Sequence, residues 1–259
     1  SIYLRYSPEV ESFGIDESWI ELTGSPLLQQ KTPLEIANEI RTTVKEEVGL
    51  TVSIGVSFNK IFAKLGSDMK KPDAVTVITR ESFKDQIWPL PVSDLLYVGR
   101  ATTEKLRLYG IRTIGDLAQA DRAMLIRRLG VNGEKLWVFA NGLDQSRVMP
   151  CDYEIPIKSV GHGITCTDDL FSKDEVRHVL MELSQEVGLK LRKNKLVATR
   201  VRISVRDNTL SQREYQGKLT FPTQSYTEIA AAGFELFCKK HTWNLSLIHI
   251  SEPTRLRCI

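Results

Sequence analysis

The chain has 259 residues, of which 42% are hydrophobic and 26% charged, and its formal net charge is +3. This is the composition of an ordinary globular protein, and no stretch has the length of a membrane span or the pattern of a signal peptide. The four cysteines are scattered, without CxxC pairs or zinc-finger spacing. They argue against a disulfide or zinc framework and favour a reducing, cytoplasmic location.

Charge is distributed unevenly along the chain. Residues 1–80 carry 9 basic and 11 acidic residues, a net charge of −2. Residues 155–243 carry 14 basic and 10 acidic residues, a net charge of +4. An acidic first third followed by a basic last third suits a metal or catalytic site joined to a module that grips nucleic acid.

Two adjacent carboxylates, Asp16 and Glu17, stand among apolar residues of strand character in the stretch Ser12 to Leu22. Burying unpaired carboxylates is costly, so carboxylates flanked by core residues need a partner. A divalent cation is the usual partner for hard oxygen ligands. The alternative is a turn with a solvated acidic tip.

The rest of the first eighty residues alternates between helix and strand. A helix is predicted from Pro33, with Thr32 as its cap, to a stop at Gly49. The elements predicted after it are a strand over 50–56, a helix over 59–68 and a strand over 74–78. This alternation indicates an α/β or α+β layered unit.

Lysines gather on the predicted helix over 59–68 and just after it. Lys60 and Lys64 form an i,i+4 pair of like charge, which repels mildly unless an anion lies nearby. Lys70 and Lys71 follow immediately before Pro72. The group suits a phosphate clamp opposite the acidic pair, and the alternative is a solvated basic face without a ligand.

From residue 92 to residue 142 the pattern is helical throughout, with short connections that contain glycine. A tight turn at Gly99 leads into a helix that we expect Thr102 or Thr103 to cap and Gly110 to end. The free backbone amides of this helix start suit a DNA phosphate. The alternative is that these glycines only end or separate helices and bind no ligand.

A third unit follows the polar connector 144–156. Its predicted elements are a strand over 158–165, a helix over 173–191, strands over 196–206 and 213–220, and a helix over 227–241. In the strand over 196–206 one face is expected to carry Val197, Thr199, Val201, Ile203 and Val205. Arg200, Arg202 and Arg206 then share the opposite face, which suits contacts with a duplex backbone or a solvated surface.

The last fifteen residues, 245–259, show neither a helical nor a strand period, and Pro253 interrupts them. Their sequence resembles the conceptual translation of a transposase adapter used in preparing sequencing libraries. We therefore expect the natural chain to stop near Asn244 and a non-native tail to follow. The alternative is an ordinary disordered tail.

Two long motifs together resemble the palm of Y-family translesion DNA polymerases. They are Ser-x-x-x-Asp-Glu-Ser-Trp from Ser12 and Gly-Val-Ser-x-Asn-Lys-x-x-Ala-Lys-x-x-Ser-Asp-x-x-Lys-Pro-Asp from Gly55. The bacterial polymerase IV and polymerase V group is the nearest likeness, which extends from Ser1 to Asn244. The resemblance implies an α+β fold with a partial palm (1–80), a small helical thumb with a helix–hairpin–helix (81–150), an α/β little finger (155–244) and a non-native tail (245–259).

The resemblance also implies roles for the palm residues. Asp16 and Glu17 match the family's second acidic motif, which holds catalytic Mg²⁺. Lys71 matches the lysine that contacts the triphosphate of the incoming dNTP. Lys64 is expected to add to the positive electrostatic field around the triphosphate without being a ligand. Asn59 and Lys60 are expected to organise the start of the helix.

The implied DNA contacts lie in the thumb and the little finger. The thumb hairpin supplies Gly99, Arg100 and Lys105, and its usual form has a glycine where Tyr97 stands. His162 is taken as an ordinary histidine. The little finger is expected to contact DNA through its entry strand and its arginine face, namely Lys158, Ser159, Gly161, Arg200, Arg202 and Arg206.

The family's chemistry needs a further aspartate from a first acidic motif, and no such segment is seen in this chain. We expect the parent to be a distributive, lesion-tolerant DNA polymerase that adds dNTPs to a primer 3′-OH, and this piece alone to be inactive. Its expected partners are primer–template DNA, dNTP and, through a region outside the piece, a sliding clamp; a monomer is expected, with no membrane contact. The alternatives are a non-catalytic DNA-binding protein and a different metal-dependent nucleotidyl enzyme.

Overall fold

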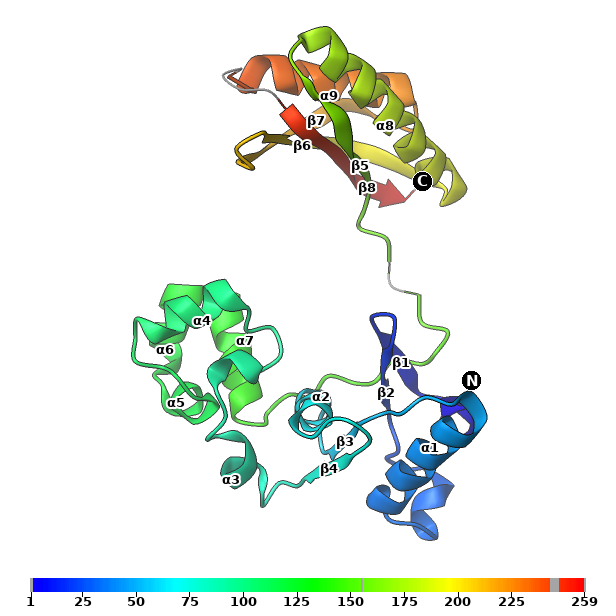
Figure 1. Ribbon diagram of the computed structural model, residues 1–259, viewed down its shortest axis with the longest axis vertical. Helices are drawn as coiled ribbons and strands as arrows, with labels where there is room; N and C mark the ends of the chain where they lie inside the picture. The colour runs from blue at the N-terminus through cyan, green and yellow to red at the C-terminus, as the bar shows by residue number, and fades with distance from the viewer. Residues whose placement is uncertain (1, 155, 243–246, 259) are drawn as a thin grey trace. The chain divides into compact units, whose positions relative to one another are not determined.

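The computed structural model describes residues 2–154, 156–242 and 247–258 (Figure 1). The chain divides into two compact units, Ser1–Tyr153 and Glu154–Ile259. Helices and strands are mixed in both units, which confirms the expected α+β class. Among the described residues, none of the helices combines the length and the apolar character needed to cross a membrane.

The first unit opens with an antiparallel hairpin of β1 (Val10–Phe13) and β2 (Glu17–Ile20). The turn between the strands begins at Gly14, whose φ of 78° lies in the left-handed region that glycine tolerates. Trp19 is buried, and its ring centroid lies 4.6 Å from that of Phe13. Short 3₁₀ helices flank the hairpin at Tyr3–Arg5 and Pro26–Gln29.

Helix α1 (Pro33–Val48) begins and ends where the sequence predicts. The Thr32 side chain accepts from the Glu35 amide, the Glu35 carboxylate accepts from the Thr32 amide, and Gly49 closes the helix at a φ of 74°. A small core forms under one face of the helix, with Ile36, Ile40 and Val44 as its buried residues.

Two parallel strands, β3 (Ile54–Ser57) and β4 (Val75–Ile78), are joined through helix α2 (Lys60–Met69). The strand predicted over 50–56 starts only at Ile54, because its partner strand supplies ladder bonds from Ala74 onward. A Cβ built on Gly55 would lie 1.9 Å from the Ala63 carbonyl oxygen. Glycine is therefore required for the close packing of α2 on β3.

The remainder of the first unit is helical, as predicted. Its elements are α3 (Phe83–Ile87), a 3₁₀ turn (Val92–Asp94), α4 (Arg100–Arg107), α5 (Ile114–Gln119), α6 (Arg122–Leu129) and α7 (Val131–Ala140). Their core is continuous with that of α2, since Phe62 belongs to the same buried cluster as Leu106, Leu117 and Leu136. The helical part therefore fixes α2 from one side while β3 fixes it from another.

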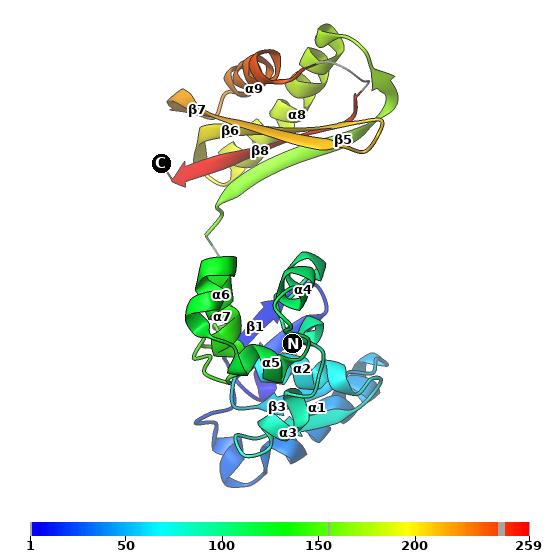
Figure 2. The ribbon, with the colours of Figure 1, turned by 90° about the vertical axis from the view of Figure 1, so that its left-hand side faces the viewer.

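The second unit is a four-stranded antiparallel sheet with two helices on one face (Figures 1 and 2). The strands stand in the order β5, β8, β6, β7. The elements are β5 (Ser159–Leu170), α8 (Lys173–Lys193), β6 (Leu196–Asp207), β7 (Gln212–Thr223), α9 (Tyr226–Lys240) and β8 (Leu247–Cys258). The core lies between helices and sheet, and the opposite face, called the open face below, is free of helices.

The face assignment predicted for β6 is wrong in its first part. Val201, Ile203 and Val205 point to the core as expected, but before them Leu196 and Ala198 are the buried residues, and not Val197 and Thr199. The pairing register shifts between Ala198 and Arg200, which marks a bulge. One extra residue in a strand moves every earlier side chain to the other face.

The prediction that residues 245–259 contain no strand is also wrong. Leu247–Cys258 forms β8, which pairs with β5 on one side and β6 on the other, while residues 245, 246 and 259 lie outside the described residues. The unpaired ladder groups of β5 and β6 account for the pairing. Pro253 lies opposite Gly161 in this inner strand and donates no ladder bond. The non-native origin of the segment stays a prediction.

Candidate functional site

The acidic pair lies at the tip of the β1–β2 hairpin. Asp16 is exposed in the turn, and Glu17 is the first residue of β2, with 36% of its side chain exposed. Of the expected apolar flank, Phe13 and Trp19 are packed, whereas Ile15 is fully exposed. The hairpin thus presents two carboxylates next to the packed rings of Phe13 and Trp19.

Helix α2 brings two lysines against this hairpin. Lys60 Nζ donates to Glu11 Oε2 at 2.6 Å and lies 4.4 Å from the ring centroid of Trp19. The indole Nε1 of Trp19 donates to the Lys60 carbonyl oxygen at 2.9 Å. One turn later, Lys64 Nζ lies 3.0 Å from Glu17 Oε1. Asn59 caps the helix by accepting from the Phe62 amide, which agrees with the expected role in organising the helix start.

The ion pairs continue from Glu17 to the end of α2. Lys64 Nζ is 2.5 Å from Asp68 Oδ2, and Lys71 Nζ is 2.7 Å from Asp68 Oδ1. Burial alone would lower the pKa of Lys64, but its bonds to Asp68 and Glu17 raise that pKa above the ordinary value. Burial likewise opposes the shift at Asp68, whose pKa is nevertheless lowered by the two lysines. Of the residues predicted for this site, Glu17 and Lys71 are thereby linked through Lys64 and through a residue that the sequence did not single out, Asp68.

A second ionic contact holds the loop that carries Lys71. Asp73 adopts a φ of 53°, and its carboxylate accepts from Arg41 Nη1 at 2.6 Å and from Lys45 Nζ at 3.1 Å. The Arg41 guanidinium also donates to the Asp73 carbonyl at 3.3 Å. These bonds lower the pKa of Asp73, Arg41 contributing first and Lys45 second. Helix α1 therefore anchors the loop that follows α2.

The chemistry of the acidic pair fits Mg²⁺, which proteins usually bind through one or two carboxylates together with substrate phosphates. Within the part of the chain that the structure describes, Asp16 has no hydrogen-bond or ion-pair partner, and Glu17 pairs with Lys64. Across those same residues, no group of three or more His, Cys, Asp or Glu side chains gathers. Asp16 and Glu17 thus form a two-carboxylate donor set.

The thumb hairpin has a different cap from the one predicted. Gly99 is the N-cap of α4, and neither Thr102 nor Thr103 caps the helix. The Thr103 amide and hydroxyl both donate to the Gly99 carbonyl. Because Gly99 has no side chain, the first amides of α4 remain free of a side-chain cap, as an anion site requires. Tyr97 adopts a φ of 70°, the conformation that the usual glycine would have.

The two cations predicted for this hairpin both lie on α4, Arg100 at its first position and Lys105 in its last turn. Arg100 is 93% exposed and pairs with Glu104 at 3.1 Å, a surface pair of small energetic value. Lys105 is exposed. The exposed Arg100 side chain can turn toward an anion near Gly99 at little cost, whereas Lys105 lies one to two turns further along the helix.

The predicted DNA contacts of the little finger gather on the open face. Along β5, Ser159 and Gly161 are exposed, whereas Val160 packs toward the helices and His162, two residues further on, lies on the same side as Val160. Lys158 is exposed just before the strand. The small residues of β5 leave its backbone accessible from the open face, and His162 does not lie on that face.

The three arginines of β6 follow the bulge and reach the open face. Arg202 Nη1 is 3.4 Å from Glu214 Oε2, Arg206 donates to the Gln212 side chain, and Arg200 has no partner within the described residues. In register with Arg200 stands Lys218 of β7. Among the described side chains of this face, the positive charge is therefore only partly compensated.

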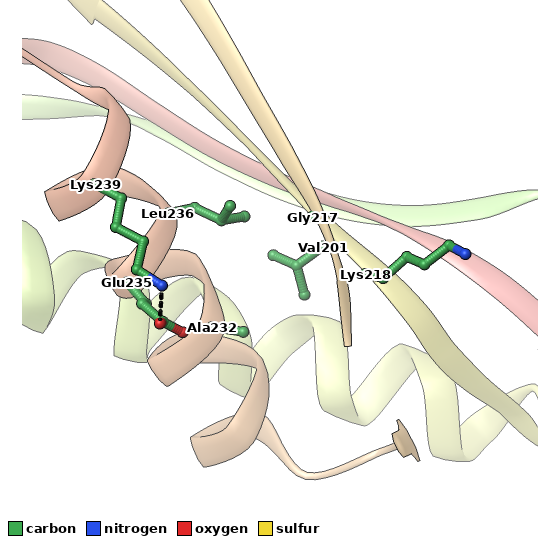
Figure 3. A pocket seen from close by; sticks show the side chains of 7 residues that line it. All are labelled: Val201, Gly217, Lys218, Ala232, Glu235, Leu236 and Lys239. Carbon is green, nitrogen blue, oxygen red and sulfur yellow. Dashed lines mark hydrogen bonds and ion pairs between the residues drawn. The ribbon is translucent and has the colours of Figure 1, made fainter. Parts of the chain in front are cut away.

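Two further features were not expected from the sequence. The Glu11–Lys60 pair also holds the connector after α7, since Met149 N donates to Glu11 Oε2 at 2.8 Å and Lys60 donates to the Arg147 carbonyl. A pocket of about 180 Å³ lies between α9 and strands β6 and β7 beside Gly217 (Figure 3). The pocket contains the Glu235–Lys239 pair and results from small residues at the helix–sheet contact. Of these contacts, only the i,i+4 spacing of Glu235 and Lys239 was a readable signal in the sequence.

Comparisons with known proteins show what the chain as a whole is similar to. Residues 1–68 match the impB/mucB/samB family, and residues 157–251 match the C-terminal domain of that family. A protein named DNA polymerase IV from Acetivibrio thermocellus is 49% identical over 243 residues, which cover 94% of this chain and 61% of the relative. A DNA polymerase IV from Clostridium kluyveri is 36% identical, with coverage of 98% and 61%.

A solved Y-family DNA polymerase chimera has a similar fold. Its TM-score is 0.79 at 19% identity, and the match covers 97% of this chain and 72% of the chimera. The chain spans about three fifths of the length of the curated relatives that it matches.

Proposed function

Because the chain belongs to the impB/mucB/samB family of Y-family DNA polymerases, we propose that it is the main part of a translesion DNA polymerase. The reaction is the transfer of a nucleotide from a dNTP to a primer 3′-OH, with primer–template DNA and dNTP as partners. We place the reaction in the cytoplasm, which agrees with the free thiols of the described cysteines. The observation that carries the proposal is the approach of the α2 lysines to the Asp16–Glu17 hairpin, with Lys64 3.0 Å from Glu17.

In this proposal the two carboxylates hold Mg²⁺, and Lys71 binds the triphosphate. When bound, Mg²⁺ supplies charge neutralisation at the phosphates and activation of the primer hydroxyl. Asp16 is available for this role because it is exposed. Glu17 is available because its ion-pair partner among the described residues is a lysine that has a second carboxylate, Asp68. Lys71 is 56% exposed at the end of α2, so it can leave Asp68 for a phosphate.

The DNA is held by the thumb and the little finger in the same proposal. The amides after Gly99, with Arg100 and Lys105, bind one phosphate backbone without reading sequence. The open face of the second unit contributes Lys158, Ser159, Gly161, Arg200, Arg202 and Arg206. Contacts of this kind are independent of base identity, which suits a polymerase that copies damaged templates.

Primer extension tests the proposal. We expect a longer version of the protein, with the upstream acidic segment that the resemblance implies, to extend a primer with Mg²⁺, and the 259-residue chain alone not to. Asp16→Ala and Glu17→Ala in the longer protein should each lower the rate by about 10²-fold or more. Glu46→Ala, an exposed acid on α1, is the matched control and should keep the rate.

DNA binding, measured by fluorescence anisotropy, separates the outcomes. The two hairpin variants should bind primer–template DNA as the unmodified protein does. Synthesis that survives both substitutions contradicts the metal role of the hairpin. A longer protein that binds DNA but never extends a primer would indicate a non-catalytic DNA-binding protein instead.

A further inference from the structure

Lys64 lies between two carboxylates from different elements of the first unit. Its Nζ is 3.0 Å from Glu17 Oε1 at the start of β2 and 2.5 Å from Asp68 Oδ2 one turn further along α2. Its side chain is 15% exposed, compared with 56% for Lys71, which pairs with the other oxygen of Asp68. The charges therefore alternate from Glu17 to Lys71, and Lys64 is the cation in contact with Glu17.

The packing of α2 does not depend on this ammonium group. The helix is held in the core by Ile61, Phe62 and Leu65. A lysine that served only the helix would be satisfied by its i,i+4 partner Asp68. Its contact with Glu17 instead joins the helix to the hairpin that carries both acidic residues of the site.

We propose that Lys64 is the resident counter-ion of the Asp16–Glu17 site, which holds the Glu17 carboxylate while no divalent cation is bound and thereby sets how tightly the cation binds. The proposal rests on the proposed function, in which Glu17 is a metal ligand. It makes Lys64 a positioning residue and not a ligand.

The geometry makes this exchange physically reasonable. A cation on Glu17 Oε1 must share or displace the ammonium that lies 3.0 Å from the same atom, and the two positive charges repel. Lys64 is not left unpaired when it withdraws, because Asp68 remains 2.5 Å away. Asp68 thus lowers the cost of releasing Glu17, and its loss should confine Lys64 to Glu17.

Two substitutions should therefore change metal affinity in opposite directions. In Lys64→Met the competing charge is gone, and the affinity for a divalent cation should rise by about tenfold at low ionic strength. In Asp68→Asn, Lys64 pairs with Glu17 alone, and the affinity should fall several-fold. A general loss of structure would weaken binding in both variants, so the opposite signs are diagnostic.

The probe is Mn²⁺ in place of Mg²⁺, titrated into the full 259-residue chain. Paramagnetic broadening of the Asp16 and Glu17 amide NMR signals reports binding at this hairpin even when it is weak. Lys64→Arg keeps the charge and should stay within about twofold of the unmodified chain. Lys31→Met removes a surface lysine that pairs with Glu39 and controls for net charge.

Glu17→Gln separates the two hypotheses. If it weakens the broadening and Lys64→Met strengthens it, the proposal stands. If Glu17→Gln weakens the broadening but Lys64→Met leaves it unchanged or weaker, only the role of Lys64 is overturned. If Glu17→Gln has no effect, the metal role of Glu17 in the proposed function falls, and the role of Lys64 falls with it.

Discussion

Charged residues are arranged differently in the two units. Between α2 and the hairpin of the first unit, cations pair with carboxylates, as in the Lys60–Glu11 and Lys64–Glu17 pairs, and Asp16 is the exception. On the open face of the second unit, Arg200 has no partner in the described part of the chain, and Arg206 bonds to a neutral glutamine. Under the proposed function, the same residue types would serve a site that exchanges ions in one unit and a surface that attracts an anionic polymer in the other.

The difference has an electrostatic reason. A site that takes up a cation and a triphosphate in turn must not carry a large fixed charge of either sign, so resident counter-ions are useful there. A surface that binds DNA without sequence preference gains affinity from every uncompensated cation, because each one releases condensed counter-ions from the duplex. Among the described residues, ion pairs thus characterise α2 and its contacts with the hairpin, and incompletely paired arginines characterise the open face.

The largest expected effect concerns the separateness of the two cores. Phe62 is fully buried beside Phe58 and Phe83 in the first unit, and Phe237 is buried under the sheet in the second. Phe62→Ala and Phe237→Ala should each lower the free energy of unfolding of their own unit by about 3–5 kcal/mol. Hydrogen exchange, resolved by residue, measures each unit separately.

The exposed Phe221 on β7 provides the matched control, since Phe221→Ala should change unfolding by less than about 0.5 kcal/mol. If a single core substitution lowered hydrogen-exchange protection in both units, the units would unfold together. The two units would then differ in their surface charges but not in the independence of their cores.

The next effect concerns the open face. Replacing Arg200, Arg202 and Arg206 together by alanine should weaken binding of primer–template DNA by about 10- to 100-fold at low salt and reduce the salt slope by about 3. Fluorescence anisotropy at several salt concentrations gives both quantities. A slope that stays unchanged would contradict the assignment of these arginines to phosphate contacts.

A triple variant with the same loss of charge on the helix side is the control for the open face. Lys173, Lys193 and Lys239 lie on α8 and α9, so their replacement by alanine should change the salt slope little. Equal effects of the two triple variants would mean that net charge, and not the open face, governs binding.

Local signals in the sequence predicted the helices well, and long-range pairing explains what they missed. The start and end of α1 follow from Thr32, Pro33 and Gly49, each of which acts within one turn of the helix. The bulge before Arg200 depends on partners from two other strands and leaves no mark in the alternation of β6 itself. The same holds for β8, whose existence as a strand is decided by the edges of its neighbours.

The candidate site divides in the same way. The acidic pair and Lys71 were found from motif and resemblance, and the Lys64–Asp68 contact is implied by helical spacing. The contact between Lys64 and Glu17 needed the packing of α2 on the hairpin, which no spacing rule contains. The sequence therefore predicted that Glu17, Lys64 and Lys71 belong to the site. Only the fold showed that Glu17 and Asp68 share Lys64 as their ion-pair partner.

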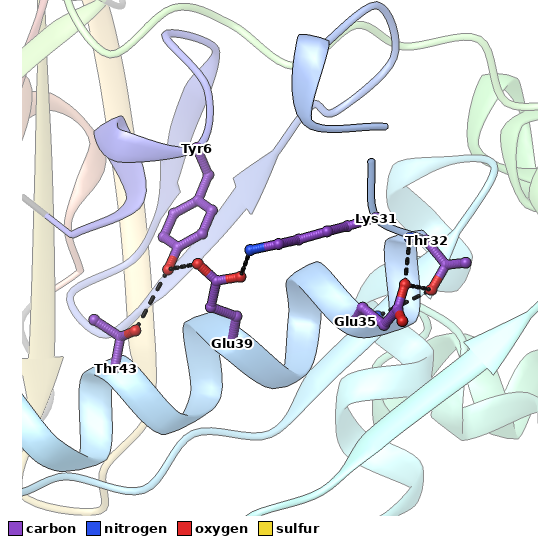
Figure 4. Close-up of polar contacts among 6 residues, drawn as sticks. All are labelled: Tyr6, Lys31, Thr32, Glu35, Glu39 and Thr43. Carbon is purple, nitrogen blue, oxygen red and sulfur yellow. Dashed lines mark hydrogen bonds and ion pairs between the residues drawn. The ribbon is translucent and has the colours of Figure 1, made fainter. Parts of the chain in front are cut away.

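Removing a helix cap should have a smaller effect on stability, and an equivalent cap in each unit allows the two units to be compared directly. Figure 4 shows Thr32 and Glu35 bonded at the start of α1, with Glu39 between Lys31 and Tyr6 further along the helix. The second unit has an equivalent capping box of Ser172 and Glu175 at α8.

Thr32→Ala and Ser172→Ala should each cost about 1 kcal/mol of stability in the unit concerned, measured by denaturant unfolding. The conservative substitution Thr32→Ser should keep most of the stability that the cap provides. A cost near zero at Thr32 but not at Ser172 would mean that the ionic contacts around Glu39 hold the start of α1 without its cap.

The smallest effect is a pH dependence confined to the first unit. Because Arg41 and Lys45 lower the pKa of Asp73, the anchoring of the loop after Lys71 is fully present above the ordinary aspartate pKa and is lost as pH falls through the lowered folded-state pKa. Carboxyl NMR titration should therefore show the Asp73 pKa rising toward its ordinary value in Arg41→Ala, with a smaller rise in Lys45→Ala. Arg5→Ala, which removes a surface partner of Glu47, should leave the Asp73 pKa unchanged. If Arg41→Ala does not move the Asp73 pKa, the ion pair does not hold this loop in solution, and the preference for paired charges in the first unit is limited to the hairpin and α2.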